Sequence, residues 1–207
     1  MHLYNRLPVY LTLAAALILC GCASTPPIPT STPTSQKIHQ QHLAKLSHIQ
    51  QFSLKGRLGV VTKKQGFSGR IDWQHALTTD TIEVFSPLGG KVAGIVKTPN
   101  GVTLTSQDGH SVKAQDAESL TEMTLGWRLP LTGLSDWAIG RPSKSKVDAS
   151  TWDEQGRLTT LTQDGWDIGF ENYADQHGYL LPSKVVLKSE KVNLKLLVEK
   201  WSTIDAH

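Results

Sequence analysis

Apolar residues and glycine alternate with polar residues from Phe52 to Val60, which is the period of a β-strand with one buried face. Similar strand patterns recur along the chain, at residues 66–73, 81–85, 91–97, 102–106, 111–114, 157–162, 166–173, 183–189 and 191–201. The dipeptides Asn100-Gly101 and Asp108-Gly109 separate neighbouring segments and favour tight hairpin turns. The pattern therefore predicts that the strands up to residue 114 form an antiparallel meander.

Apolar residues take helical spacing in three places, over about residues 37–50, 117–125 and 131–139. Asp116 is suited to cap the second of these helices, because its carboxylate can accept hydrogen bonds from free backbone N–H groups. Gly126 and Gly140 are suited to end the second and third helices. The last two helices together form an insert between two groups of strands.

We therefore expect a mainly β fold with a helical insert (α+β). The expected architecture is an open antiparallel β-barrel of about eleven strands covered by about three helices, because a sheet of that size tends to curl. Such a shape can enclose an apolar cavity. A filled core produces the same sequence pattern, so both readings remain open at this point.

The N-terminus has the layout of a secretory signal, with basic Arg6 followed by an apolar run from Leu11 to Leu19. That run is shorter than the roughly 20 residues that a membrane-spanning helix needs. The ending Leu19-Cys20-Gly21-Cys22 resembles the lipobox of bacterial lipoproteins, with Cys22 as the modified cysteine. The alternative is an ordinary secretory signal with two incidental cysteines. We interpret residues 1–21 as a lipoprotein signal peptide.

The lipobox resemblance implies that Cys22 becomes the acylated first residue and anchors the protein to the periplasmic face of a membrane. Ala23 follows it in place of an inner-membrane retention aspartate, which implies the outer membrane. Residues 23–36 are rich in Pro, Ser and Thr, so we expect residues 22–36 to be an acylated tether. A single domain is expected over residues 37–207.

The sequence carries no catalytic motif at a persuasive spacing, and we expect no enzymatic activity. His39, His42 and His48 share one helical segment, and a solvated helix face is the simplest interpretation of them. We expect no metal site and no cofactor. The formal net charge of +3, without a stripe of basic and aromatic residues, also argues against nucleic-acid binding.

Two further features bear on function. The six tryptophans either fill a core or line a ligand cavity, where their flat faces would suit acyl chains. The stretch Ser86-Pro87-Leu88-Gly89 reads as a turn with a leucine at its tip. Leu88 either folds back into the core or is held outward to contact something apolar.

The segment 126–142, GWRLPLTGLSDWAIGRP, resembles the central segment of the LolB family of outer-membrane lipoprotein receptors. The Ser86-Pro87-Leu88-Gly89 turn resembles the protruding loop of that family, and Ile71-Asp72-Trp73-Gln74 resembles an early strand. The resemblance covers essentially the whole domain and implies an eleven-stranded open barrel closed by helices. It also implies a function: lipoproteins are accepted from the periplasmic carrier LolA through their acyl chains and are inserted into outer-membrane lipid.

The resemblance implies roles for individual residues. Leu88, flanked by Pro87 and Gly89, would assist insertion into lipid, and Trp73, Trp137 and Trp201 are candidates for the acyl-chain cavity. We expect the protein to act as a monomer. Gly90-Lys91 departs from the family pattern and would loosen the loop.

Two other classes of function are considered. One is a lipocalin-like outer-membrane lipoprotein that binds a free small apolar ligand, but lipocalin barrels lack the mid-chain helical insert seen between Asp116 and Gly140. The other is an envelope enzyme, which turnover of peptidoglycan or lipid would reveal.

Overall fold

The computed structural model describes residues 32–125 and 128–206, which belong to one compact unit beginning at Thr32. Within these residues the chain forms three helices and one antiparallel sheet of eleven strands. The helices are α1 (Pro33–Ser47), α2 (Ala117–Leu125) and α3 (Leu131–Ala138). The strands are β1 (Ile49–Thr62), β2 (Gly66–Ala76), β3 (Thr79–Phe85), β4 (Lys91–Thr98), β5 (Gly101–Ser106), β6 (Ser111–Ala114), β7 (Val147–Trp152), β8 (Leu158–Gln163), β9 (Trp166–Gln176), β10 (Tyr179–Lys188) and β11 (Val192–Ala206).

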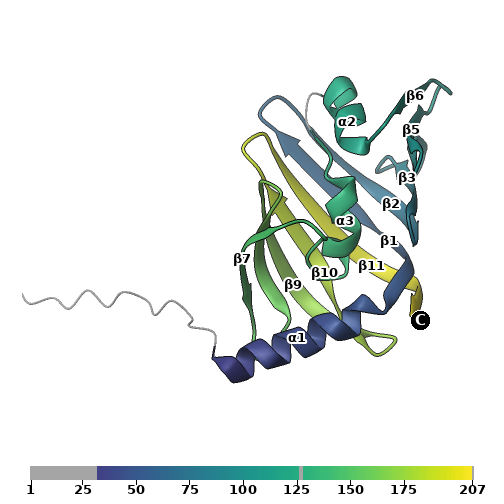
Figure 1. Ribbon diagram of the computed structural model, residues 1–207. Helices are drawn as coiled ribbons and strands as arrows, with labels where there is room; N and C mark the ends of the chain where they lie inside the picture. The colour runs from purple at the N-terminus through teal and green to yellow at the C-terminus, as the bar shows by residue number, and fades with distance from the viewer. Residues whose placement is uncertain (1–31, 126–127, 207) are drawn as a thin grey trace, which may run out of the picture. The chain divides into compact units, whose positions relative to one another are not determined.

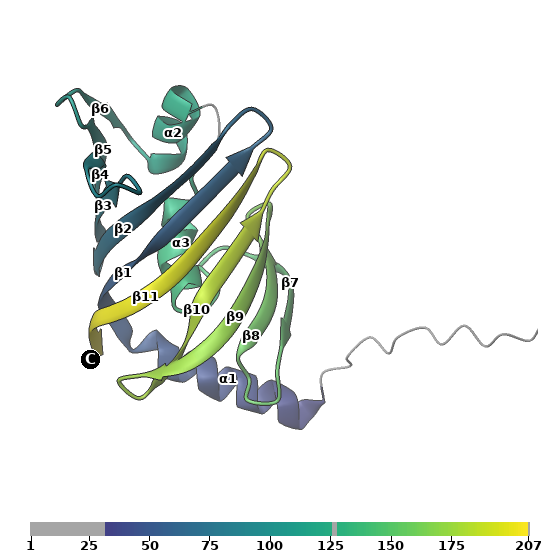
Figure 2. The same cartoon turned by 180° about the vertical axis from the view of Figure 1, so that it is seen from behind.

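The first and last strands pair in the middle of the sheet. The strand order is β6-β5-β4-β3-β2-β1-β11-β10-β9-β8-β7, so β1 and β11 join two meanders. Their pairing runs from Ile49 opposite Ala206 to Thr62 opposite Val192. The edge strands β6 and β7 do not pair with each other, so the sheet curls without closing (Figure 2). The expected mainly β architecture with a meander in its first half is confirmed.

α3 lies on the concave side of this sheet, and α1 and α2 lie toward opposite ends of it (Figure 1). α3 follows the concave face, and Leu131, Leu134, Trp137 and Ala138 on this helix are all buried. These side chains join one core with the inward residues of both meanders. The described residues thus contain their own connected hydrophobic core.

The beginning of the domain differs from the sequence expectation. α1 begins at Pro33, inside the segment expected to be an extended tether up to residue 36. Proline is favoured in the first helical turn, and the Thr32 hydroxyl accepts a hydrogen bond from Ser35 N at 3.2 Å. The helix ends at Ser47, and Ile49 already belongs to β1. The domain boundary therefore lies before residue 37.

Two other local expectations change. β7 was not expected from the sequence, because it is an edge strand whose side chains are mostly exposed and whose apolar and polar residues alternate over only four positions. His39 does not lie on a solvated face, since it is buried and its ring stacks on Trp152 at 4.2 Å between centroids. By contrast, the cap at Asp116 is confirmed, with Ser119 N donating to its carboxylate at 2.6 Å.

The close contact of β1 with β11 gives the first testable prediction. A methyl group at Gly56 would overlap the carbonyl oxygen of Leu197, whereas one at Gly59 would approach nothing closer than Lys195 O at 3.9 Å. Gly56→Ala should lower the free energy of unfolding by about 1–3 kcal/mol because the strands must separate locally. Gly59→Ala, on the same strand, is the matched control. Equal midpoints of the two variants in urea denaturation would contradict this account of the pairing.

Candidate functional site

The turn between β3 and β4 holds Leu88 in solvent. Its side chain is 99% exposed, more than any other large apolar side chain in the described chain. Ser86 N donates to Gly90 O at 2.8 Å, and Gly89 N donates to Ser86 O at 2.9 Å. Serine, proline and glycine occupy the first, second and fourth positions of this β-turn, where each is favoured, and Gly89 has the positive φ of +94° that glycine tolerates.

The residues Gly90 and Lys91, which were expected to loosen the loop, lie where the turn closes and β4 begins. The carbonyl of Gly90 accepts one of the two hydrogen bonds that close the turn, and Lys91 already belongs to β4. The turn is therefore a short structure closed by backbone hydrogen bonds, and its apolar tip points away from the protein.

Two of the three candidate tryptophans pack together in the core. Trp73 on β2 and Trp201 on β11 both contact Phe52 on β1 edge-on, with ring centroids 5.2 and 5.5 Å from the Phe52 ring. Their exposed fractions are 1% and 6%. The three rings come from neighbouring strands and form an aromatic cluster on the concave face near the centre of the sheet.

Trp137 lies apart from this aromatic cluster, on α3. Its Nε1 donates to Gln163 Oε1 at 2.9 Å, and both side chains are fully buried. The Gln163 amide also donates to the backbone carbonyls of Ser143 and Ser145. One glutamine on β8 therefore fixes both α3 and the segment that follows it.

Arg141 makes a second polar connection beside α3. Its Nε donates to Asp136 at 2.7 Å, and its Nη1 donates to the carbonyls of Leu46 and Ile49 at 2.6 and 3.1 Å. These bonds join the end of α3 to the junction between α1 and β1. Neither Gln163 nor Arg141 was singled out from the sequence, because their partners are distant in the chain.

A cluster of polar and charged side chains from β2, β3 and β4 surrounds a buried carboxylate. The Asp80 carboxylate is fully buried and accepts hydrogen bonds from Trp73 Nε1 at 2.9 Å and from Lys97 Nζ at 3.3 Å. His75 Nδ1 lies 2.7 Å from the same carboxylate. Burial alone would raise the pKa of Asp80, but the bonds from His75 and Trp73 and the charge of Lys97 outweigh it, so this pKa is lowered. The cluster fixes the indole of Trp73.

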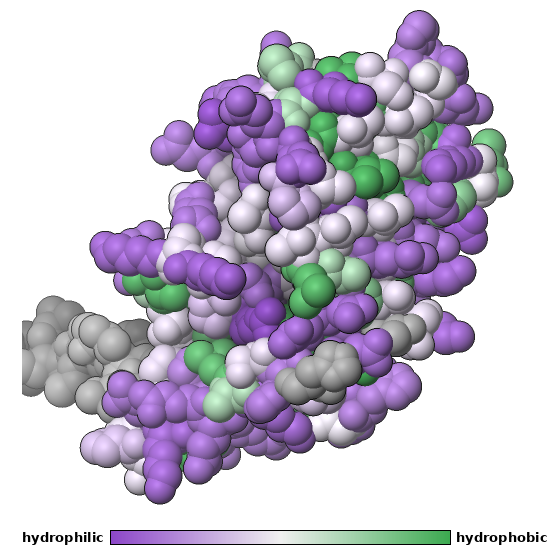
Figure 3. All heavy atoms as spheres, turned by 45° about the vertical axis from the view of Figure 1, so that its right-hand side comes forward, coloured by the Kyte–Doolittle hydropathy of each residue, from purple (hydrophilic) through white to green (hydrophobic). Residues whose placement is uncertain are grey.

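A groove of about 840 Å³ lies between α3 and the turns that follow β2, β4 and β8. Figure 3 turns this side of the molecule partly forward and shows a largely polar surface with small, separate apolar patches. The groove is lined by both charged and aromatic side chains, among them His75, Lys97, Asp136, Trp137, Arg141 and Trp166. Of the three candidate tryptophans, Trp137 lines the groove, whereas Trp73 and Trp201 lie in the packed core.

Some expected features lie outside what the structure describes. Cys22 and Trp127 fall outside the described residues. Within the described residues, no group of three or more metal-ligating side chains is close enough to hold an ion. None of the helices in that part of the chain is long and apolar enough to span a membrane.

The fold belongs to a class seen in solved structures: one open antiparallel sheet wrapped around helices. A LolA superfamily protein from Nitrosomonas europaea aligns with a TM-score of 0.50 at 9% identity, covering 82% of this chain and 93% of that one. A putative outer membrane lipoprotein-sorting protein domain from Vibrio parahaemolyticus aligns with a TM-score of 0.51 at 7% identity, covering 81% and 92%. At these identities the likeness shows the fold alone.

The sequence comparisons define the family. The family described as "Outer membrane lipoprotein LolB" matches residues 50–201. Relatives named outer-membrane lipoprotein LolB include one from Nitrosomonas europaea, 36% identical over 91% of this chain and 90% of its own length. Another, from Thiobacillus denitrificans, is 34% identical over 96% of this chain and 98% of its own length. The chain belongs to the LolB family.

The buried carboxylate gives a second prediction. Asp80→Asn should lower the free energy of unfolding by about 3 kcal/mol, because it leaves Lys97 without its buried counter-charge. Asp72→Asn, which removes the partner of Lys55 in an exposed ion pair, is the matched control and should change stability by less than about 0.5 kcal/mol.

The pH dependence of this effect has a defined sign. Because the pKa of Asp80 is lowered on folding, its stabilising contribution is fully present above its ordinary pKa of 3.8 and is lost as the pH falls below that value. Urea denaturation at a series of pH values should therefore show a shallower acid loss of stability for Asp80→Asn than for the unsubstituted chain. Parallel acid profiles would contradict the role given to Asp80.

Proposed function

We propose that this protein is a lipid-anchored outer-membrane receptor that accepts lipoproteins from a LolA-type periplasmic carrier and inserts them into the outer membrane. Its anchor is the acylated Cys22 on the periplasmic face. The single observation that carries the proposal is the fully exposed Leu88 on a hydrogen-bonded turn, in a chain of the LolB family.

The exposed leucine supports a contact with lipid. A soluble surface gains nothing from an isolated leucine that is 99% exposed, whereas burying such a side chain in an apolar phase stabilises by about 1.5–3 kcal/mol. That energy is too small to hold a protein on a membrane by itself. It is large enough to bring a loop of an already anchored protein into the headgroup region, where acyl chains can be released.

Acyl chains are received in the space between the sheet and α3. Trp73 and Trp201 on the sheet and Trp137 on α3 are the proposed aromatic contacts for the chains. Because these side chains are buried in the present conformation, binding requires α3 to move away from the concave face. The groove of about 840 Å³ lies beside this helix.

Direction comes from relative affinity, so the transfer needs no covalent chemistry. If the space beneath α3 binds acyl chains more tightly than the carrier does and less tightly than the bilayer does, cargo moves one way. A difference of about 1.4 kcal/mol at each step gives a tenfold bias.

The proposal predicts that Leu88→Glu separates reception from delivery. The variant should fold normally, since the Leu88 side chain makes no core contact, and should still take acylated cargo from a LolA-type carrier. Delivery to vesicles should fall at least tenfold, because a carboxylate replaces the apolar tip. Transfer of a labelled lipoprotein to phospholipid vesicles measures both steps.

Met123→Glu is the matched control, because Met123 is 68% exposed on α2 and receives the same change of charge. It should deliver normally. Normal delivery by Leu88→Glu would overturn the proposed role of the turn. Failure of cargo reception by the unsubstituted chain would overturn the receptor function itself.

A further inference from the structure

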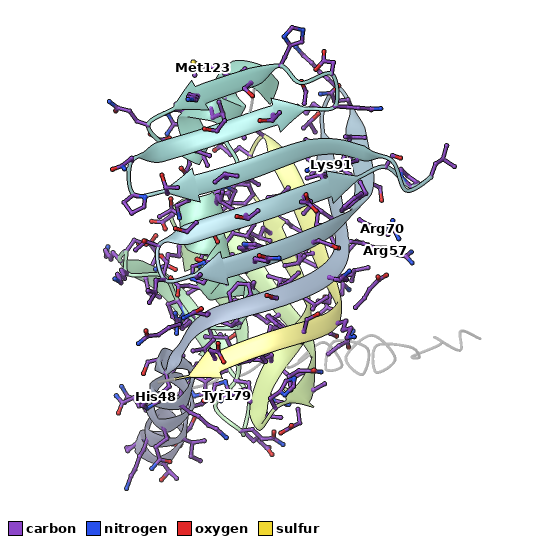
Figure 4. The ribbon with its side chains drawn as sticks, turned by 90° about the vertical axis from the view of Figure 1, so that its right-hand side faces the viewer. His48, Arg57, Arg70, Lys91, Met123 and Tyr179 are labelled. Carbon is purple, nitrogen blue, oxygen red and sulfur yellow. The ribbon has the colours of Figure 1, made fainter. Side chains whose placement is uncertain are left out.

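A row of outward-facing residues crosses the four strands next to the Leu88 turn. Strand pairing places Arg57 on β1 opposite Arg70 on β2, Arg70 opposite Phe85 on β3, and Phe85 opposite Lys91 on β4. Three cations therefore lie on the same face at the end of the sheet where the turn protrudes. Figure 4 shows Arg57, Arg70 and Lys91 together at this end, beside the protruding loop.

The three cations differ in their partners. Arg57 Nε forms an ion pair with Glu199 at 2.6 Å, and Lys91 Nζ forms one with Glu83 at 2.7 Å. Within the described residues Arg70 has no carboxylate at ion-pair distance, and its guanidinium lies 5.7 Å from the centroid of the Phe85 ring. Arg70 is thus the cation of this row whose charge is not neutralised by a neighbour in the fold.

The strand register makes the positive charge of Arg70 unfavourable for the stability of the fold. Two arginines directly opposite each other on one face of an antiparallel pair repel, and only Arg57 is compensated by an acid. The contact of Arg70 with the Phe85 ring does not neutralise its charge. An external anion would remove the repulsion.

Arg70 also lies next to the turn that carries Leu88. Its Nη2 is 3.6 Å from the position that a Cβ on Gly89 would occupy, so the guanidinium sits against the backbone of the turn, set back from the leucine at the tip. An apolar side chain that enters a membrane reaches the boundary between headgroups and acyl chains, about 5–10 Å deep. A group set back from that tip meets the layer of lipid phosphates.

We propose that Arg70 binds the phosphate of a phospholipid headgroup when Leu88 enters the membrane. A guanidinium presents paired N–H donors that match two phosphate oxygens, and the pair gains from being beside an apolar phase. Leu88 and Arg70 then form a two-part membrane contact, one part apolar and one part anion-binding. The inference rests on the proposed membrane role of the Leu88 turn and deepens it.

The test uses the chain from Ala23 onward, without its acyl anchor, in flotation with vesicles. Phosphatidylethanolamine and phosphatidylglycerol make up one set of vesicles, and digalactosyl diacylglycerol, which has no phosphate, makes up the other. Arg70→Gln should weaken binding to the phospholipid vesicles about fivefold, the contribution of one basic residue at an anionic surface. It should leave binding to the glycolipid vesicles unchanged, and Arg70→Lys should restore part of the loss.

Arg57→Gln is the matched control, because it removes the same charge from the same row at an arginine that already has a partner. It should bind phospholipid vesicles within about twofold of the unsubstituted chain, a smaller change than the loss of an unpaired charge. Equal losses for Arg57→Gln and Arg70→Gln, or the same loss by Arg70→Gln on glycolipid, would overturn the phosphate site.

Leu88→Glu distinguishes this inference from the proposed function. It should lose binding to both kinds of vesicle. If Arg70→Gln loses phospholipid binding while Leu88→Glu retains it, the phosphate site stands and the membrane role of the leucine fails. Near-ultraviolet circular dichroism of each variant checks that the tryptophan core is intact.

Discussion

The concave face of an open sheet must be covered, and this constraint explains most of the molecule. Eleven strands curl without closing, so the inward residues of both meanders would contact water if no helix lay against them. α3 supplies much of that cover with buried Leu131, Leu134 and Trp137. The hydrogen bonds of Gln163 and Arg141 add polar contacts that hold this helix in place.

The pairing of β1 with β11 determines where the β3–β4 turn lies. Because β1 and β11 pair in the middle of the sheet, the strands β1 to β6 follow one another in order on one side of that pair. The β3–β4 turn protrudes from one end of these strands, with a single leucine at the tip and Arg70 behind it. The proposed reception beneath α3 and the proposed delivery at the turn would thus use different elements of one domain.

Most of the fold could be predicted from the sequence, because alternation and turn dipeptides are local signals. The turn at Leu88 was predictable for the same reason, since serine, proline and glycine occupy the positions that such a turn favours. β7 was not, because the alternation in this exposed edge strand covers only four residues. The bonds of the buried Asp80 and the position of Arg70 next to the Leu88 turn involve residues on neighbouring strands, and only the register of the sheet brings those together. The family resemblance supplied the functional hypothesis.

The proposed receptor function requires this domain to take acylated cargo from a carrier. The most direct measurement mixes the unacylated chain with a LolA-type carrier loaded with a labelled lipoprotein and determines by co-purification which protein holds the label. If the domain is a receptor, the label moves to it without any added nucleotide. A folded domain that leaves the label on the carrier would overturn the receptor function.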